Sequence, residues 1–257
     1  MNLNLTGKVV VITGGGQGIG KGTALEFARE GCKVAICGRT AKTLEAAKRE
    51  LEALKCSAYM EVVDVSNISA TEAFANRIME TWGGIDIWVN NAAIAFDIPI
   101  ENVTEQNWDS MMSINLKAVY FNSRTAARCM CKGKKGGVII NVSSFGAVVP
   151  NPSRAIYGAA KSGVNSLTRS FAANYAPYGI RVVSVLPGPT DTEMNRMLKN
   201  VVDNSALMRS GTAEEIARPI VFMSSDASSY LTGVGVEISG GKLCVQRPKA
   251  SWDAAKQ

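Results

Sequence analysis

Apolar residues along the chain follow two alternating spacings. Short runs rich in valine and isoleucine are typical of strands buried on both faces, and they lie at Lys8–Ile12, Lys33–Cys37, Tyr59–Val63, Ile85–Val89, Val138–Val142, Arg181–Leu186 and Val234–Ile238. Between them, stretches with apolar residues at helical spacing lie at Gly18–Glu30, Ala41–Leu54, Ser69–Trp82, Glu105–Cys131, Ser153–Tyr175 and Ala213–Ser224. This alternation predicts an α/β fold in which one parallel sheet of about seven strands carries helices on both faces.

One domain accounts for the pattern, because no internal repeat, low-complexity tract or linker interrupts it. We expect this domain to span residues 1–245. The stretch 187–212 is long for a connection between a strand and a helix, which predicts a substrate loop. Residues 246–257 are expected to form a polar C-terminal tail.

Composition narrows the classes of function. The chain has 257 residues, 46% of them hydrophobic, which is enough for one full core. The net charge of +6 is interpreted as ordinary solubility, with attraction to an anionic ligand as the alternative. No run of Lys and Arg reaches five residues, so a nucleic acid partner is not expected.

The sequence also bears on location and metal binding. No apolar run approaches the roughly 20 residues that a membrane span requires, and the N-terminus has no export signal. A cytoplasmic location and no membrane partner are therefore expected. The six cysteines form no C-x-x-C pair and the chain has no histidine, so no metal site is expected.

The missing histidine excludes Ser-His-Asp triads, Cys-His pairs and histidine-based zinc sites. Another acid–base pair is present, because Tyr157 and Lys161 stand four residues apart and would share one face of a helix. The ammonium group is expected to favour the ionised phenol and so to lower its pKa. A tyrosine tuned in this way could transfer a proton near neutral pH.

A glycine-rich segment leads from the first strand into the first helix. Gly14 is expected to permit a tight turn, while Gly18 and Gly20 let backbone N–H groups approach a pyrophosphate at the positive end of the helix. The place of this segment, between a strand and a helix, is the one that a dinucleotide-binding motif requires.

The end of the second strand reads Cys37-Gly38-Arg39-Thr40 and has no carboxylate. In dinucleotide-binding folds an acidic residue here holds the ribose 2′-hydroxyl of NAD, whereas an arginine accommodates a 2′-phosphate. Arg39 could hold the phosphate with a fork of donors. It therefore predicts NADP(H), with NAD(H) as the alternative.

Seven motifs in order resemble those of the short-chain dehydrogenase/reductase family from end to end. They are Thr13-Gly14…Gly18-Ile19-Gly20, Asp64-Val65, Asn90-Asn91-Ala92-Ala93, Asn115, Ser144, Tyr157-x-x-x-Lys161 and Pro187-Gly188-x-x-x-Thr192. The resemblance implies a single-domain, Rossmann-like, doubly wound parallel sheet.

The resemblance also implies catalytic roles. Tyr157 would be the general acid for ketone reduction and the general base for alcohol oxidation, and Lys161 would lower its pKa and hold the nicotinamide ribose. Ser144, rather than Ser143, would hydrogen-bond the substrate oxygen. Asn115 would hold a water that links Lys161 to bulk solvent, and a mid-helix asparagine is unusual on propensity alone.

The remaining motifs are assigned to the cofactor by the same resemblance. Besides Tyr157 and Lys161, the residues expected to bind it are Gly14, Gln17, Gly18, Ile19, Gly20, Arg39, Asp64, Val65, Asn91, Ala92, Pro187, Gly188, Thr190 and Thr192. Asp64 would hold the adenine ring, Asn91 and Ala92 would pass under the adenosine ribose, and the segment from Pro187 would clamp the nicotinamide carboxamide.

Three positions depart from the family pattern. Ala93 replaces a glycine, and Ser239 replaces the aspartate of a terminal Asp-Gly-Gly. Gln17 stands where many NADP(H)-preferring relatives carry a basic residue, so phosphate recognition would rest mainly on Arg39.

These features predict an NADP(H)-dependent enzyme of the carbonyl or 3-oxoacyl reductase type, which interconverts a ketone and a secondary alcohol. A non-catalytic NADP(H)-binding regulator and a basic nucleic acid-binding module are the alternatives. A mainly apolar small-molecule substrate is expected from Ile94, Phe96, Phe145, Val148, Pro152, Met194 and Met197. By family resemblance the chain would form a homodimer or homotetramer through Glu105–Cys131 and Ser153–Tyr175, with an interface around Cys129, Met130, Leu167 and Phe171.

Overall fold

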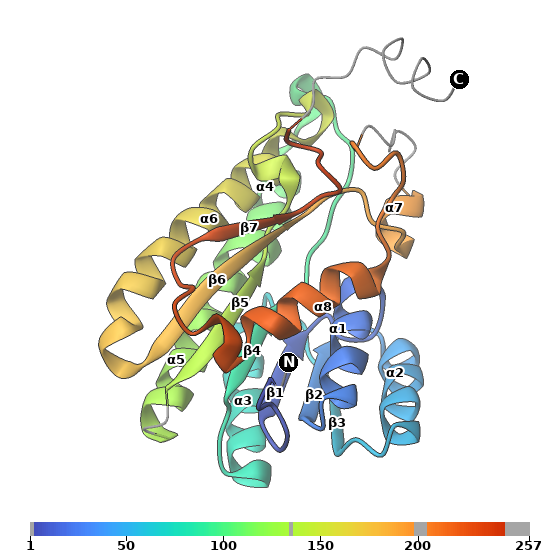
Figure 1. The fold of residues 1–257 in the computed structure, drawn as a ribbon. Helices are drawn as coiled ribbons and strands as arrows, with labels where there is room; N and C mark the ends of the chain where they lie inside the picture. Colours follow the sequence, from blue (N-terminus) through green and yellow to red (C-terminus); the bar gives the residue numbers. More distant parts are fainter. Residues whose placement is uncertain (1–2, 134–135, 198–204, 245–257) are drawn as a thin grey trace.

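The computed structural model describes residues 3–133, 136–197 and 205–244. Their strands form one sheet in the order β3-β2-β1-β4-β5-β6-β7, and every neighbouring pair is parallel. The strands are β1 Val9–Thr13, β2 Lys33–Gly38, β3 Ala58–Val62, β4 Ile87–Asn90, β5 Gly137–Val142, β6 Ile180–Pro187 and β7 Gly235–Ile238. The predicted doubly wound, Rossmann-like architecture is confirmed (Figure 1).

Helices cover both faces of the sheet. They are α1 Gly18–Arg29, α2 Ala41–Ala53, α3 Ile68–Trp82, α4 Glu105–Met112, α5 Ala118–Gly133, α6 Ala155–Tyr175, α7 Glu193–Met197 and α8 Ala213–Met223. Buried side chains of α1, α2 and α8 belong to one apolar cluster, and those of α3, α5 and α6 belong to another. No helix in the part of the chain that the structure describes has the length and apolar character needed to cross a bilayer.

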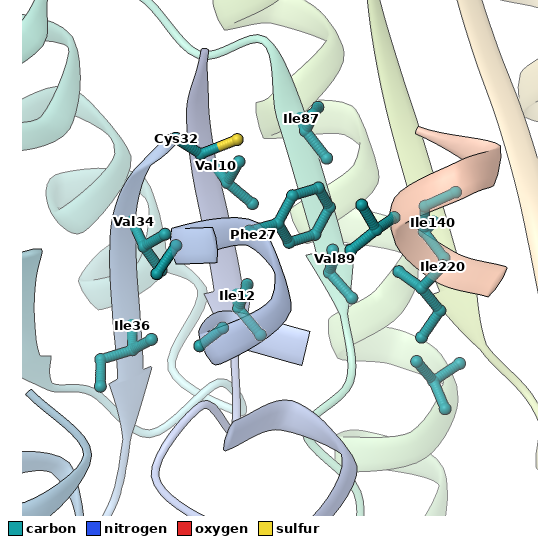
Figure 2. Close-up of a cluster of buried hydrophobic side chains, with 14 of the residues drawn as sticks. Val10, Ile12, Phe27, Cys32, Val34, Ile36, Ile87, Val89, Ile140 and Ile220 are labelled. Atoms are coloured by element: carbon teal, nitrogen blue, oxygen red, sulfur yellow. The ribbon is translucent and has the colours of Figure 1, made fainter. Parts of the chain in front are cut away.

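Successive residues of the central strands point to opposite faces, which explains why these strands are apolar throughout. In β1, Val10 and Ile12 enter the cluster under α1, whereas Val9 and Val11 enter the cluster on the other face. Phe27 of α1 is fully buried among the side chains of Val10, Ile87 and other strand residues (Figure 2). Truncating such a ring costs about 3–5 kcal/mol, so α1 is firmly fixed on the sheet.

The helix predicted over Glu105–Cys131 is interrupted. Its middle is a π-helical turn, Ser113–Lys117, between α4 and α5. A π-turn inserts one residue into the helical repeat and is common at functional sites. The predicted helix Ser153–Tyr175 also differs at its start, because Pro152–Arg154 forms a 3₁₀ turn before α6. Helix α7 was not predicted, and it lies within the proposed substrate loop.

The order of the strands in the sheet determines where a ligand-binding crevice is expected. β1 lies between β2 and β4 in the sheet. The strands that follow β1 in the sequence, β2 and β3, therefore lie on one side of it, and β4 to β7 lie on the other. In doubly wound sheets, ligands bind at this switch point, outside the carboxyl ends of the strands. Gly14 follows β1 and Asn91 follows β4, so the predicted cofactor motifs lie at this crevice.

Candidate active site

A cavity of about 620 Å³ opens at the carboxyl ends of the strands. Its walls come from the segments that follow six of the seven strands, β1 to β6, together with Lys242 beyond β7. Of the predicted cofactor residues, the described lining includes Gly14, Gln17, Gly18, Ile19, Arg39, Asp64, Val65, Asn91, Ala92, Tyr157, Lys161, Pro187, Gly188, Thr190 and Thr192. Ser144 belongs to the same wall. Residues that lie far apart in the sequence therefore converge on one site.

The glycine loop, residues 14–20, has the backbone geometry that its sequence predicts. Gly14 and Gly18 have φ angles of +67° and +53°, which L-amino acids with side chains rarely adopt. The N–H group of Gly14 donates to the carbonyl of Cys37 at 2.7 Å, which ties the turn to β2. Asn91 donates from Nδ2 to the carbonyl oxygens of Thr13 and Gly14, at 3.0 and 3.1 Å, and ties it to β4.

Gly20 has a role in packing, and its predicted contact with a pyrophosphate stays a prediction. It was predicted to open the backbone towards a pyrophosphate, yet it is not among the described residues that line the cavity. A Cβ atom at Gly20 would lie 2.2 Å from the carbonyl oxygen of Gly14 and 2.4 Å from Nδ2 of Asn91. Gly20 therefore allows α1 to pack closely on the loop, whereas Gly14 and Gly18 shape the cavity itself. The sequence could not separate these two uses of glycine.

One end of the cavity carries the residues predicted to select the nucleotide. Arg39 is exposed, and Asp64, which lies after β3, is exposed beside it. Although partial burial acts to raise the pKa of Asp64, hydrogen bonds from Ser66 and the charge of Arg39 lower it. Arg39 therefore lies close enough to Asp64 for its positive charge to lower the pKa of that carboxyl group. The glycine-rich loop, this cation and the open crevice fit a nicotinamide dinucleotide.

Ser144 and Tyr157 meet at the other end of the cavity. Ser144 ends the segment after β5 in an extended conformation, and its Oγ accepts a hydrogen bond from Gly146 N at 3.0 Å. Tyr157 lies in the first turn of α6, and its phenol interacts with the Ser144 hydroxyl. The neighbouring Ser143 points elsewhere, because its Oγ donates to the carbonyl of Lys161 at 3.1 Å. This geometry favours Ser144 over Ser143 as the partner of Tyr157.

Lys161 lies one turn after Tyr157 and is only 2% exposed. Its Nζ donates to the carbonyl of Val142 at 2.8 Å and lies 5.6 Å from the centroid of the Tyr157 ring. Burial lowers the pKa of Lys161 to about 8, because a buried ammonium loses its hydration.

The predicted lowering of the Tyr157 pKa by Lys161 is not found in this structure. Burial raises the pKa of Tyr157, and this rise is opposed by the hydrogen bond with Ser144 and by the charge of Arg154. The reason is geometric, since the ammonium of Lys161 faces the ring and is bonded to a backbone carbonyl. The i,i+4 spacing brings the two residues together but does not determine which atoms meet.

Asn115 is fully buried in the π-helical turn. Its Oδ1 accepts from Ile94 N at 3.0 Å and its Nδ2 donates to Ile94 O at 2.8 Å. The side chain thus fixes the segment after β4 that forms a wall of the cavity. Asn115 is not among the described lining residues, and its predicted role as a water ligand stays a prediction.

The segment after β6 closes the cavity from a further side. Gly188 is required there, because a Cβ atom would lie 2.6 Å from both the Cα atom and the carbonyl oxygen of Ser239. Thr190 is buried and donates from Oγ1 to the carbonyl of Gly188 at 3.0 Å. A Cβ atom at Gly18 would lie 3.3 Å from Cγ2 of Thr192, so this segment reaches across to the glycine loop. Residues 198–204 of the predicted substrate loop, and the predicted tail, lie outside the described residues.

Some of the residues that were predicted to face the substrate line the cavity, and others do not. Ile94, Phe145, Pro152 and Met194 line the cavity. Phe96 and Val148 are not among its described lining, and Val148 is 58% exposed. The side chain of Met197 lies outside what the structure describes.

Three charged residues of the described lining were not predicted, and one of them, Glu193, is the first residue of α7. Arg154 lies three residues before Tyr157, and Lys242 follows the glycine pair after β7. The i,i+3 spacing between Arg154 and Tyr157 was a usable signal, because such residues share a helix face. Lys242 had no local signal, since only the packing of its turn brings it to the cavity.

Comparison with known proteins agrees with this geometry. The sequence profile described as short chain dehydrogenase matches residues 8–202. A 3-oxoacyl-(acyl-carrier-protein) reductase, FabG, of Thermotoga maritima is 35% identical over 244 residues, covering 93% of this chain and 99% of the relative. The 3beta-hydroxysteroid dehydrogenase 2 of Eggerthella lenta is 34% identical over 247 residues, covering 92% and 95%.

Solved structures are similar over almost the whole chain. A short-chain type dehydrogenase/reductase from Mycobacterium marinum superposes with a TM-score of 0.90 at 30% identity, covering 95% of this chain and 98% of that one. Levodione reductase gives a TM-score of 0.88 at 32% identity, covering 92% and 98%.

Proposed function

Because this chain is a member of the short-chain dehydrogenase/reductase family, we propose that it uses NADP(H) to interconvert a ketone and a secondary alcohol. The family places it among oxidoreductases that act on carbonyl and alcohol groups. The observation that carries the finer proposal is the convergence of Ser144, Tyr157 and Lys161 on the cavity that Arg39 also lines.

Two hydroxyl groups would hold the substrate carbonyl. The oxygen would lie between Ser144 and Tyr157, where two donors stabilise its developing negative charge. When bound, the nicotinamide supplies the hydride to the carbonyl carbon in reduction and accepts it in oxidation. Tyr157 would give its proton to the oxygen, so that the product is the neutral alcohol.

Lys161 would hold the ribose of the nicotinamide nucleotide, which is the role that the family resemblance gives it. Its ammonium is buried 5.6 Å from the centre of the tyrosine ring and donates to the carbonyl of Val142. Asn115 would act indirectly, by holding the backbone of Ile94 in the cavity wall.

The preference for NADP(H) rests on Arg39. The residues at the end of β2 include no carboxylate that would repel a 2′-phosphate, and Arg39 is exposed at the cavity. A guanidinium group can bind a phosphate through two parallel hydrogen bonds. Gln17 lines the same cavity but is neutral, so the charge of Arg39 would supply most of the selection.

We infer the substrate class from two sources, the names of the similar proteins and the residues that line the cavity. The names of the similar proteins point to ketone or hydroxyl groups on acyl chains, steroids and a levodione. The side chains of Ile94, Phe145, Pro152 and Met194 form apolar walls around the predicted carbonyl site. We therefore propose the carbonyl or 3-oxoacyl reductase type, acting in the cytoplasm on a small molecule.

The proposal is tested by replacing the proton donor. Tyr157→Phe should reduce kcat for NADPH-dependent ketone reduction by about 10²–10⁴-fold, the usual contribution of a positioned acid. NADPH binding, followed by fluorescence titration, should stay within a few-fold of the wild type. Unchanged kcat would contradict the proton-donor role.

Wild-type protein supplies the second arm of this test. NADPH binding without turnover of any ketone or alcohol in a broad screen would instead identify a non-catalytic NADP(H)-binding protein.

A further inference from the structure

Arg154 lies where the segment after β4 meets the start of α6. It is the last residue of the 3₁₀ turn before that helix, and its Nε donates to Asp97 Oδ1 at 2.5 Å. A backbone hydrogen bond accompanies this ion pair, since Ile98 N donates to the carbonyl of Ser153 at 2.8 Å. Arg154 and Asp97 are 57 residues apart in the sequence, so these links fix the guanidinium group between two distant segments.

Little water reaches this ion pair. The side chains of Arg154 and Asp97 are only 15% and 26% exposed. Arg154 and Tyr157 line the main cavity together, and they also line a second, small pocket with the apolar side chains of Phe96 and Met111. In such surroundings a charge is weakly screened and acts strongly on a neighbouring ionisable group.

The charge of Arg154 acts on the phenol of Tyr157. The two residues are three positions apart, a spacing that brings side chains together across one helical turn. The positive charge of Arg154 opposes the rise in the pKa of Tyr157 that burial produces. The ammonium of Lys161 instead faces the tyrosine ring and donates to the carbonyl of Val142.

This placement bears on the proton transfer. During ketone reduction, Tyr157 would give its proton to the substrate oxygen and remain as a phenolate. We propose that Arg154 is a positioning residue for this step, whose guanidinium group, held by Asp97, stabilises the Tyr157 phenolate, an inference that rests on the proposed function. In alcohol oxidation the same charge favours the phenolate that accepts the proton. Asp97 has the opposite charge, so it holds the guanidinium in place and also moderates its effect.

Other charged groups also line the cavity. Lys161 belongs to α6 itself, Glu193 to α7 and Lys242 to the turn after β7. These groups, and those at the nucleotide end, are unchanged in the variants used below. A difference between variants therefore reports on the ion pair of Arg154 and Asp97.

Nuclear magnetic resonance measures the ionisation of Tyr157 without turnover. Tyrosine is labelled with carbon-13 at Cζ, the Tyr157 signal is assigned by its loss in Tyr157→Phe, and the protein without nucleotide is titrated with pH. Arg154→Gln should raise the midpoint by about one pH unit, because it removes the cation and leaves the carboxylate. Asp97→Asn should lower the midpoint, because it removes the charge that opposes the cation.

Three controls separate the effect of charge from that of packing. Arg154→Lys keeps the charge and should have a midpoint close to the wild type. Arg154→Gln combined with Asp97→Asn replaces the ion pair with two amides, and its midpoint should lie above the wild type but below that of Arg154→Gln alone. Arg169→Gln, at an exposed position of α6, should leave the midpoint unchanged. Circular dichroism verifies that each variant is folded at every pH used.

Shifts in opposite directions in the two single variants are the expected result. Equal midpoints in all proteins, or shifts in the same direction in Arg154→Gln and Asp97→Asn, would overturn the electrostatic role of Arg154. A purely structural role would lower kcat in both variants without these opposite shifts.

Kinetics connect the ionisation to the reaction. The pH dependence of kcat is measured for NADP⁺-dependent oxidation of neutral secondary alcohols, from 2-butanol to 2-octanol. It should shift in the same directions as the resonance midpoints, because Tyr157 must be ionised to accept the proton. A kcat profile that stays fixed while the midpoints move would overturn the role in proton transfer. Absence of turnover of every alcohol contradicts the proposed oxidoreductase, whereas the midpoints still decide whether Arg154 stabilises the phenolate.

Discussion

At the scale of single residues, the site depends on what surrounds each ionisable group. Lys161 is almost fully buried, and burial lowers its pKa from the usual 10.5 to about 8. The ammonium lies beside the Tyr157 ring and donates to the carbonyl of Val142, and burying it in the charged form costs stability. Such residues commonly trade stability for activity.

The free-energy cost of burying the Lys161 ammonium can be measured from how the stability of the protein changes with pH. Between pH 8 and 10.5 the unfolded chain binds more protons at Lys161 than the folded protein, so this residue makes stability rise with pH in that window. Lys161→Met removes this contribution. In urea unfolding without cofactor, the stability of the variant relative to the wild type should therefore decrease by roughly 3 kcal/mol from pH 8 to 10.5. If the free energies of unfolding of the variant and the wild type changed with pH in parallel, burial would not lower the pKa of Lys161.

The proposed preference for NADP(H) also depends on one residue, Arg39. Arg39→Asp should lower the NADPH affinity by about 100-fold, because it replaces a phosphate-binding charge with a repelling one, about 3 kcal/mol in all. NADH binding should change only a few-fold. Fluorescence titration of both cofactors gives the ratio, with Lys42→Asp as a control on the neighbouring exposed position. A variant that still prefers NADPH would refute the assignment of the 2′-phosphate to Arg39.

At the scale of elements, close contacts between backbones decide how the cavity is shaped. The first turn of α1 approaches the loop after β1 so closely that Gly20 has no room for a side chain. The π-helical turn between α4 and α5 similarly directs Asn115 towards Ile94. Both features lie at junctions between elements, where sequence periodicity is least informative.

Substitution of Gly20 tests this packing. Alanine is better than glycine in a helix by about 1 kcal/mol on propensity alone. At Gly20 the new Cβ atom would meet the Gly14 carbonyl, so Gly20→Ala should instead destabilise by roughly 2 kcal/mol in urea unfolding and weaken NADPH binding. Gly84→Ala, where the new Cβ atom would have no neighbour within 4 Å, should change stability by less than about 0.5 kcal/mol. Equal effects of the two variants would contradict the packing argument.

These cases show where sequence-based prediction succeeded. The alternation of strands and helices, the parallel sheet and the family were predicted correctly, because long apolar periodicities and ordered motifs carry that information, whereas α7 and the break between α4 and α5 were not predicted. The packing contact of Gly20 and the direction of the Tyr157 pKa shift could not be predicted, since they depend on which atoms face each other. Arg154 and Lys242 were missed for the same reason.

At the scale of the whole molecule, the predicted oligomer interface needs correction. Cys129, Met130 and Phe171 are 5%, 1% and 7% exposed and belong to the core of the single chain, so they are not available to a partner. The outer side of α5 and α6 instead presents Tyr120, which is 42% exposed and packs edge-on against the rings of Phe121 and Phe171. Association through these helices stays a prediction, now centred on Tyr120.

Light scattering tests this prediction. The wild-type protein is expected to have the mass of a dimer or tetramer. Tyr120→Glu should shift the distribution towards monomer, because it places a charge in an apolar contact and typically costs a few kcal/mol. Asn76→Glu, which adds the same charge at an exposed position of α3, should leave the mass unchanged. A monomeric wild type, or a Tyr120→Glu oligomer, would rule out this interface.

The sequence by itself determined the α/β fold, the order of its seven strands along the chain and the family, because each of these follows from periodicity and motif order along the chain. Only the tertiary structure decided that Gly20 serves packing, that Asn115 holds Ile94, and that Arg154 and Lys242 reach the cavity. Those facts depend on distances between residues that are remote in sequence, and on which side chains lose contact with water. Neither quantity is encoded in local spacing.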